Sequence, residues 1–293
     1  MKRLQSFRPA SWLVRVLLLV AIALPSLLIT SPVFVAYAAD LPTVSDVTGP
    51  VPSDSIIYAS DGESVLADLH PSGYQHYQES LSSMGTLLPE AVIAIEDRNF
   101  YDEPGVDALS IARAAIVDWK AKDSVQGAST ITQQLVKIRL VGAEPTIDRK
   151  IREAMLSFEI ERRYTKNQIL EAYLNSVPFG NSAFGSEAAS QIFFHTTTAK
   201  LDLAQAAMLA GLVRGPTYYS PFTNWHAAKD RQYQVLDAMV RAGYITKSVA
   251  DWAFAEDLRP PKHMFGPVNN IIAPGFVSYA TQKLLQKYGS DMT

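Results

Sequence analysis

Helical periodicity over most of the chain is the feature that most limits its fold. Beyond Leu88, apolar residues recur every three or four positions in alanine-rich runs, and short stretches of Gly, Pro, Asn and Thr interrupt them. Two helix starts show the spacing of a capping box, Thr165 with Gln168 and Asp202 with Gln205. The sequence therefore predicts a mainly α fold.

One short β element is expected before the helices. Residues 55–70, SIIYASDGESVLADLH, contain two β-prone runs on either side of Asp61-Gly62. Asp-Gly readily supplies the positive φ angles of a tight turn. We therefore predict a small β-hairpin there.

The N-terminal region has the character of a membrane-directed segment. Residues 1–15 carry Lys and Arg but no acid, which predicts a cytoplasmic basic tail. Residues 16–39 are apolar over a length that matches the ~20 residues needed to cross a bilayer, so we predict a transmembrane helix. The small-x-small sequence at 36–38 leaves a cleaved signal peptide as the alternative. Either way, the rest of the chain is expected outside the cytoplasm.

The remaining chain divides into a linker and one large domain. Residues 40–54 are rich in Pro, Ser, Thr and Val without helical period, which is typical of an extended linker. Residues 55–293 are predicted to form the domain. A net charge of −3, from 26 basic and 29 acidic residues, gives no polyanion-binding surface and excludes nucleic acid as the expected partner. The absence of cysteine excludes disulfides, thiolate metal sites and cysteine nucleophiles.

The first chemical motif is AIEDRNFYDEPGVD, where a helical run ends in the adjacent acids Glu96 and Asp97. A carboxylate beside aromatic residues at a helix end is a candidate general base. The alternative is an ion pair with Arg98 on a solvated surface. The motif alone does not decide between them.

The second motif is QGASTITQQLVK, in which a glycine precedes Ser129 and Thr130 at a predicted helix start. Free backbone amides and the positive end of the helix dipole favour an anion there. Gln133 and Lys137 are four residues apart and share one helix face, so both could reach a phosphate. The alternative is an ordinary capping box from Thr130 to Gln133.

Two further segments carry polar residues in a helical pattern. In RKIREAMLSFEIERRYTK, Arg149 and Lys150 precede Glu153 by four and three residues, which predicts a carboxylate held by cations or simply a salt-bridged surface helix. In ILEAYLNSVPFGNSAFGSEAASQIFF, packing and turn chemistry explain most positions. Glu171 and Asn175 are the polar exceptions.

Taken in order, these segments resemble the signature blocks of the peptidoglycan glycosyltransferase domain found in class A penicillin-binding proteins and their monofunctional relatives. The resemblance covers residues 54 to 290. The blocks EDxxF, GxSTITQQxxK, RKxxE, KxxILExYLN and LAxAAxLAGL correspond to residues 96–100, 127–137, 149–153, 166–175 and 201–212.

The resemblance implies a lysozyme-like fold with a head lobe and a membrane-dipping jaw lobe. It implies that Glu96 takes the proton from the 4-hydroxyl of GlcNAc on lipid II, whose oxygen attacks the anomeric carbon of MurNAc in the growing chain. Undecaprenyl diphosphate leaves with inversion, and Lys137 contacts the diphosphate. Glu153 is implied to assist departure or to order the site. The other positions implied to line the cleft are Asp97, Phe100, Ser129, Thr130, Gln133, Gln134, Arg149, Lys150, Glu171 and Asn175.

The resemblance also sets expectations about partners and localisation. It implies lipid II, the growing lipid-linked glycan, the bilayer and other cell-wall synthesis proteins as partners. It also implies a single-pass protein of the bacterial plasma membrane, with its catalytic domain on the extracytoplasmic side. A divalent cation, Mg²⁺ or Mn²⁺, at the diphosphate is left open, and no other cofactor is expected.

The chain departs from the family pattern at four positions, where Glu103, Ile138, Pro145 and Gln205 replace the usual His, Asn, Arg and Glu. These departures keep a catalytically weakened cell-wall scaffold as an alternative. A lysozyme-like enzyme that cleaves murein is the other. No SxxK or KTG motif occurs, so acylation by β-lactams is not expected, and the chain is either monofunctional or truncated before a transpeptidase domain.

Overall fold

The computed structural model describes residues 42–49, 55–62, 65–69, 75–102, 129–142 and 146–265, with isolated positions beyond them. The chain divides into two units, Met1–Thr43 and Val44–Thr293, and the second contains everything discussed below. The predicted basic tail and the apolar segment 16–39 lie outside the described residues. Within the described ranges, no helix combines the length and the apolar character that crossing a bilayer requires.

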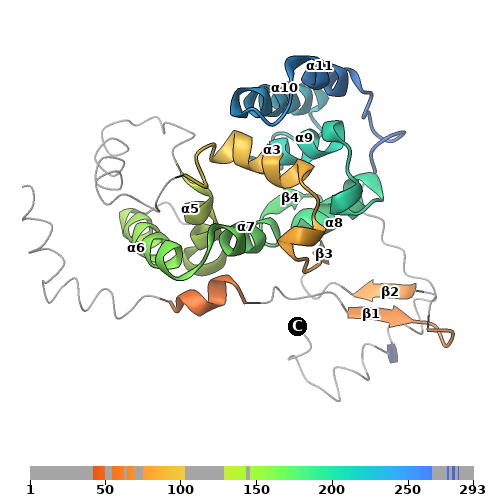
Figure 1. The fold of residues 1–293 in the computed structure, drawn as a ribbon. Helices are drawn as coiled ribbons and strands as arrows, with labels where there is room; N and C mark the ends of the chain where they lie inside the picture. Colours follow the sequence, from red (N-terminus) through yellow and green to blue (C-terminus); the bar gives the residue numbers. More distant parts are fainter. Residues whose placement is uncertain are drawn as a thin grey trace, which may run out of the picture. The chain divides into compact units, whose positions relative to one another are not determined.

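The mainly α prediction is confirmed for the described residues (Figure 1). The longer helices are α3 (Leu87–Glu96), α5 (Ile131–Val136), α6 (Ile147–Arg163), α7 (Lys166–Leu174), α8 (Ser186–Phe194), α9 (Leu203–Leu212), α10 (Trp225–Ala242) and α11 (Lys247–Ala255). The short helical turns are η1 (Val44–Val47), η2 (Leu81–Ser83), the π-helical turn η3 (Lys137–Val141) and η4 (Thr198–Lys200).

Helices α3, α9 and α10 pack against one another and form one part of the core. Nearly every residue of α9 is buried, which explains why its sequence is apolar on all sides rather than on one face. Helix α3 ends at Glu96, because the backbone of Asp97 leaves helical geometry (φ −156°, ψ 73°). This packing carries the end of α3 and the middle of α10 to the same place (Figure 1).

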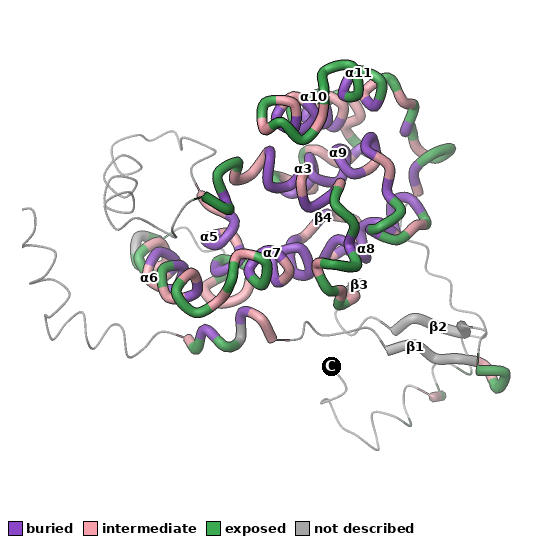
Figure 2. Tube along the Cα trace, viewed as in Figure 1, coloured by how far each residue is buried: buried purple, intermediate pink, exposed green. Residues whose placement is uncertain are grey.

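Helices α5, α6 and α7 form a second packed group, and α5 contacts both of the others. The whole of α5 except Gln134 is buried, as the purple trace in Figure 2 shows for this segment. After Val136 the helix widens into η3 at Lys137. Such π-helical turns occur frequently at functional sites.

The predicted hairpin is confirmed. Strands β1 (Ser55–Tyr58) and β2 (Val65–Leu69) pair antiparallel, and Gly62 in the turn has a φ of +73°. A second sheet was not predicted: β3 (Gln75–His76), β4 (Pro178–Gly180) and β5 (Ala183–Phe184) pair in the order β3-β5-β4. Strands of two or three residues are too short to show a period of two, so no local pattern predicts them.

Both predicted capping boxes are present. The side chain of Thr165 accepts from the Gln168 amide and the Gln168 side chain accepts from the Thr165 amide; Asp202 and Gln205 are arranged in the same way. A cap of this kind contributes about 1 kcal/mol to stability. The starts of α7 and α9 are therefore fixed by residues at most three positions apart.

Two acidic side chains lie together: Glu79, from the segment before η2, and Glu187, from α8. Glu187 is 5% exposed, and its carboxylate accepts hydrogen bonds from Thr198 and from Gln191. Glu79 lies beside it. Burial raises the pKa of Glu79 to about 7, and the negative charge of Glu187 adds to the effect.

This pKa makes the stability of the fold depend on pH. Folded Glu79 holds its proton up to about pH 7, whereas the unfolded chain releases it near the ordinary glutamate value of 4.5. The stabilisation is therefore fully present below the unfolded value and is lost as pH rises through the folded one. We expect the melting temperature to fall between about pH 5 and about pH 8, and to fall less for Glu79→Gln. Equal slopes for the two proteins would contradict the assignment.

Candidate active site

The carboxylate of Glu96 lies at the end of α3 and is largely buried. Its Oε2 accepts a hydrogen bond from Gln134 Nε2 at 2.9 Å, and its Oε1 accepts one from Arg231 Nη2 at 3.1 Å. The side chains of Glu96 and Arg231 are 11% and 4% exposed. The structure therefore pairs Glu96 with a buried cation from α10, and not with Arg98 on a solvated surface.

Arg231 is held on its other sides as well. Its Nη1 donates to Gln234 Oε1 at 3.0 Å, and its guanidinium lies 5.7 Å from the centre of the Tyr219 ring. Burial lowers the pKa of Arg231, and the charge of Glu96 opposes that shift. A β-carbon added at Gly211 would stand 3.0 Å from Arg231 Cγ, so the missing side chain at this position gives Arg231 its room.

The sequence analysis did not single out Arg231. The one local signal is its place in the buried stripe of α10, where it stands among apolar residues such as Ala228 and Val235. An arginine is almost never fully buried unless it is paired. That signal predicts a partner for Arg231 but does not say which acid it is.

Gln134 connects Glu96 to a buried tyrosine on α7. The hydroxyl of Tyr173 donates to Gln134 Oε1 at 2.7 Å, which directs Nε2 of the same amide toward Glu96. Tyr173 is fully buried. Burial, followed by the charges of Glu96 and Asp97, raises the pKa of Tyr173, so the hydroxyl keeps its proton and acts as a donor.

The start of α5 is satisfied by protein groups. Asp97 Oδ2 accepts from the Ile131 amide at 3.0 Å, and Gln133 Oε1 accepts from the Thr130 amide at 3.2 Å. Thr130 Oγ1 in turn accepts from the Gln133 amide at 3.2 Å. The Thr130–Gln133 capping box is therefore present, and protein groups engage the amides of Thr130, Ile131 and Gln133. Anion binding at this helix start stays a prediction. Asp97, Thr130 and Gln133 serve the helix start.

A second carboxylate, Glu153, is clamped by two cations on α6. Arg149 Nη1 donates to its Oε2 at 2.6 Å, and Lys150 Nζ donates to its Oε1. Lys150 Nζ also donates to Ser129 Oγ at 3.3 Å. The predicted carboxylate held by cations is confirmed, and at 2% exposure Glu153 is buried rather than part of a surface salt bridge.

Lys137 is an exposed cation at the end of α5. It stands three residues after Gln134, where α5 passes into η3, so the two side chains lie one helical turn apart on neighbouring positions. Within the ranges that the structure describes, it makes no ion pair. Glu153 engages both Arg149 and Lys150. Lys137 therefore reaches solvent close to the residue that contacts Glu96.

Comparison with known proteins gives the family. The model of the transglycosylase family matches residues 63–240. The chain belongs to the transglycosylase family. The resemblance to the transglycosylase domain of class A penicillin-binding proteins is thereby confirmed.

Individual relatives are longer proteins. Penicillin-binding protein 2D of Bacillus subtilis (strain 168) is 39% identical over 243 residues, which are 82% of this chain and 34% of that protein. Penicillin-binding protein 1A of Aquifex aeolicus (strain VF5) is 46% identical over 172 residues, 59% of this chain and 24% of the relative. The crystal structure of penicillin-binding protein 1A from Haemophilus influenzae aligns with a TM-score of 0.47 at 18% identity, covering 83% of this chain and 25% of that one. This transglycosylase chain thus spans about a quarter to a third of the relatives' length.

Three residues expected to bind substrate make contacts within the protein, and their contact with substrate stays a prediction. Phe100 is 1% exposed and packs in the core, with Lys166 Nζ 4.7 Å from its ring centre. Asn175 accepts from the Glu79 amide at 3.0 Å and donates to its carbonyl at 2.7 Å. Glu171 Oε2 accepts from the amide of Leu81 at 2.8 Å. The two α7 side chains therefore fasten the chain before η2, and they line a cavity of about 250 Å³ there.

The structure describes two of the four departures from the family pattern. Ile138 is 37% exposed, next to Lys137. Gln205 caps α9 through Asp202, a role that a glutamate would fill equally well. Glu103 and Pro145 lie outside the described residues.

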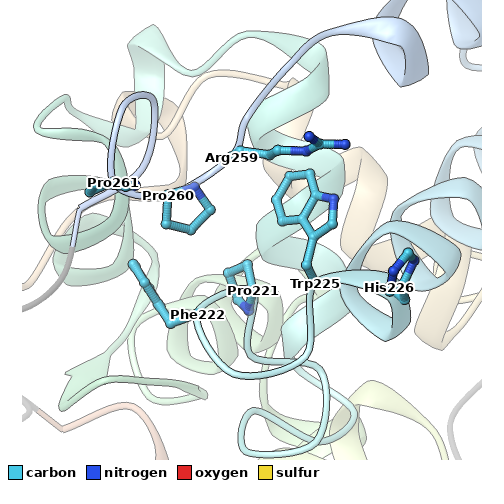
Figure 3. Close-up of a pocket in the computed structure, with 7 residues that line it drawn as sticks. All are labelled: Pro221, Phe222, Trp225, His226, Arg259, Pro260 and Pro261. Carbon is cyan, nitrogen blue, oxygen red and sulfur yellow. The ribbon is translucent and has the colours of Figure 1, made fainter.

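Another cavity lies away from these residues. It measures about 690 Å³ and is lined by Pro221, Phe222, Trp225, His226, Arg259, Pro260 and Pro261 (Figure 3). The guanidinium of Arg259 lies 5.9 Å from the ring centre of Trp225. Because no carboxylate lines this cavity and it shares no residue with the Glu96 site, we do not assign the chemistry to it.

The described residues contain no group of three or more His, Asp or Glu side chains placed to hold a metal ion. The divalent cation at the diphosphate stays a prediction.

We expect Asn175→Ala to destabilise the fold without weakening substrate binding. The change leaves the amide and carbonyl of Glu79 without their partner, which costs about 1–3 kcal/mol. Denaturant unfolding measures the loss, and KM measured below the melting temperature should not change. Asn167→Ala on the same helix is the control, because Asn167 bonds only an exposed tyrosine hydroxyl. A raised KM with normal stability would restore Asn175 to the binding site.

Proposed function

We propose that this chain is a peptidoglycan glycosyltransferase that polymerises lipid II into glycan strands and releases undecaprenyl diphosphate. The observation that carries the proposal is the Glu96 carboxylate, which accepts hydrogen bonds from Gln134 and Arg231. The exposed Lys137 stands three residues after Gln134, one helical turn along the chain. Membership of the transglycosylase family supports glycosyl transfer as the class of reaction. The donor, the acceptor and the roles below belong to the proposal.

Glu96 acts as the general base. A carboxylate has about four acceptor positions, and the described contacts use two of them. The others are available to the 4-hydroxyl of the acceptor GlcNAc. As the proton passes to Glu96, the hydroxyl oxygen forms a bond to the anomeric carbon of MurNAc in the growing chain. The bond from that carbon to the diphosphate oxygen breaks on the opposite face, which inverts the configuration.

Lys137 meets the charge that develops on the leaving diphosphate. A lysine ammonium placed where negative charge appears stabilises the transition state more than the ground state. Lys137 is exposed and unpaired among the described residues, so it can bind the diphosphate without breaking an ion pair. Arg149, Lys150 and Glu153 together carry one net positive charge and add to the positive potential.

Glu153 orders the cations rather than transferring a proton. Both of its oxygens are engaged by α6 cations, and the side chain is buried. Of the two roles that the sequence implied, the contacts support ordering the site.

The contacts of Glu96 also bear on the alternative of a murein-cleaving enzyme. A lysozyme-like hydrolase needs a protonated carboxyl group as general acid. Both oxygens of Glu96 accept hydrogen bonds, one from Gln134 and one from the guanidinium of Arg231, and an acceptor of this kind suits a base. Glycan synthesis is therefore the better supported direction.

We further propose that the domain acts on the extracytoplasmic side of the plasma membrane and is held there by the segment 16–39. Lipid II and the growing glycan both carry lipid tails in the bilayer. An enzyme tethered beside them gains effective concentration. The growing lipid-linked glycan, the bilayer and other cell-wall synthesis proteins are the proposed partners.

We expect Glu96→Gln to abolish polymerisation while leaving the fold intact. Glutamine keeps the shape of the side chain but cannot take the proton, so kcat should fall by about 10²–10⁴-fold. A gel-based assay of lipid II polymerisation measures activity, and the melting temperature reports the fold. Glu90→Gln, on the same helix, is the control and should stay active. Unchanged turnover in Glu96→Gln would remove Glu96 from the mechanism, and failure of the wild type to form glycan would favour the scaffold alternative.

Substitution of Lys137 tests the diphosphate contact. A charge-assisted hydrogen bond is worth about 1.5–3 kcal/mol, so Lys137→Ala should lower kcat/KM by roughly 10- to 100-fold. Lys137→Arg keeps the charge and should retain more activity. Lys200→Ala, another exposed lysine, should behave as wild type. Equal activity of Lys137→Ala and the wild type would place the diphosphate elsewhere.

A further inference from the structure

The two oxygens of Glu96 are held by donors that come from opposite sides of the molecule's core. Gln134 comes from α5 and Arg231 from α10, and each donor is itself bound on its far side. A side chain with one partner can turn about its bonds. A side chain with partners at both ends has its direction fixed. The question is whether this arrangement only stabilises the core or also sets the geometry of the base.

Gln134 presents its donor end to Glu96 because Tyr173 occupies its acceptor end. An amide group has one acceptor oxygen and one donor nitrogen at nearly the same distance, and its surroundings decide which faces which way. With the Tyr173 hydroxyl donating to Oε1, Nε2 must face Glu96. Without that hydroxyl, the amide is able to turn and present its oxygen to the carboxylate, which repels it.

Arg231 is fixed by contacts of three kinds. Gln234 accepts from its Nη1, the Tyr219 ring lies against the guanidinium, and the surface of Gly211 backs its stem. Its Nη2 is consequently aimed at Glu96 Oε1. Arg231 thus supplies direction as well as charge.

We propose that Tyr173, acting through Gln134, and Arg231 are positioning residues that aim the remaining lone pairs of Glu96 at the acceptor hydroxyl. This inference rests on the proposed function. Neither residue is placed against substrate: Tyr173 is fully buried and Arg231 is 3% exposed. Their effect should therefore fall on the reaction step and not on substrate affinity.

Tyr173→Phe is the sharpest variant, because it keeps the buried ring and removes only the hydroxyl. We expect kcat to fall about fivefold or more and KM to stay within about twofold, since one neutral hydrogen bond is lost and the base loses its direction. The assay uses the purified full chain with lipid II. Tyr101→Phe is the matched control: its hydroxyl also bonds an amide side chain, that of Asn167, but on the exposed surface. It should keep wild-type kcat.

A double-mutant cycle tests whether Tyr173 acts through Gln134. Gln134→Met removes the bridging amide at similar volume. If the inference is correct, adding Tyr173→Phe to Gln134→Met lowers kcat no further, because the connection is already broken. Two effects that multiply would show that Tyr173 acts on its own and would overturn the relay. This comparison uses only folded variants, with the melting temperature as the check.

Arg231 is tested by rescue. Arg231→Met removes the donor, and Arg231→Lys restores a charge and one donor, so Lys should recover part of the kcat that Met loses, with KM again little changed. Equal kcat for both variants would reduce Arg231 to a structural role. If Arg231→Met does not fold, comparison of Arg231→Lys with the wild type decides: a normal kcat contradicts the inference, and a lowered kcat with normal KM supports it.

The outcomes separate this inference from the proposed function. Wild-type kcat in Tyr173→Phe together with an inactive Glu96→Gln would overturn the positioning role and leave the glycosyltransferase assignment standing. An active Glu96→Gln, or a wild type without glycan synthesis, would overturn the proposed function itself.

Discussion

The ion pair between Glu96 and Arg231 is the interaction on which the site depends. It joins the end of α3 to the middle of α10, two helices that also pack directly on each other and on α9. Each charge is nearly removed from water, so either one alone would be costly to bury, and together they are tolerated. Gly211 on α9 leaves the space that Arg231 needs. The packing of α3, α9 and α10 therefore also determines where the Glu96 carboxylate lies.

Glu96 and Glu153 lie in different surroundings, and this difference bears on their proposed roles. Glu96 has one cationic and one neutral donor and keeps 11% of its side chain accessible. Glu153 has two cationic donors and is 2% exposed. A group that must take a proton needs access and spare acceptor positions, whereas a group that holds cations needs neither. The contrast supports a base at Glu96 and an organising role for Glu153.

Motif spacing singled out residues whose contacts in the structure are of different kinds. It brought Glu96, Gln134, Lys137 and Glu153 into the argument, and the structure places Gln134 on Glu96 and two cations on Glu153. It also assigned Phe100 and Asn175 to substrate, whereas the first fills the core and the second ties down a loop. A polar or aromatic residue inside a motif block has the same spacing whether it faces the ligand or the interior. Spacing along one helix therefore cannot distinguish these cases.

The sequence by itself determined those features that depend on residues close together in the chain. Helix type, the capping boxes at Thr165 and Asp202, the hairpin turn at Gly62 and the Arg149–Glu153 pair all join residues within a few positions of one another. Only the tertiary structure decided that Arg231 meets Glu96 across 135 positions and that Tyr173 meets Gln134 across 39. Such contacts exist because helices pack face to face. The energy of that packing is shared by many apolar side chains, so no local pattern records which polar groups it brings together.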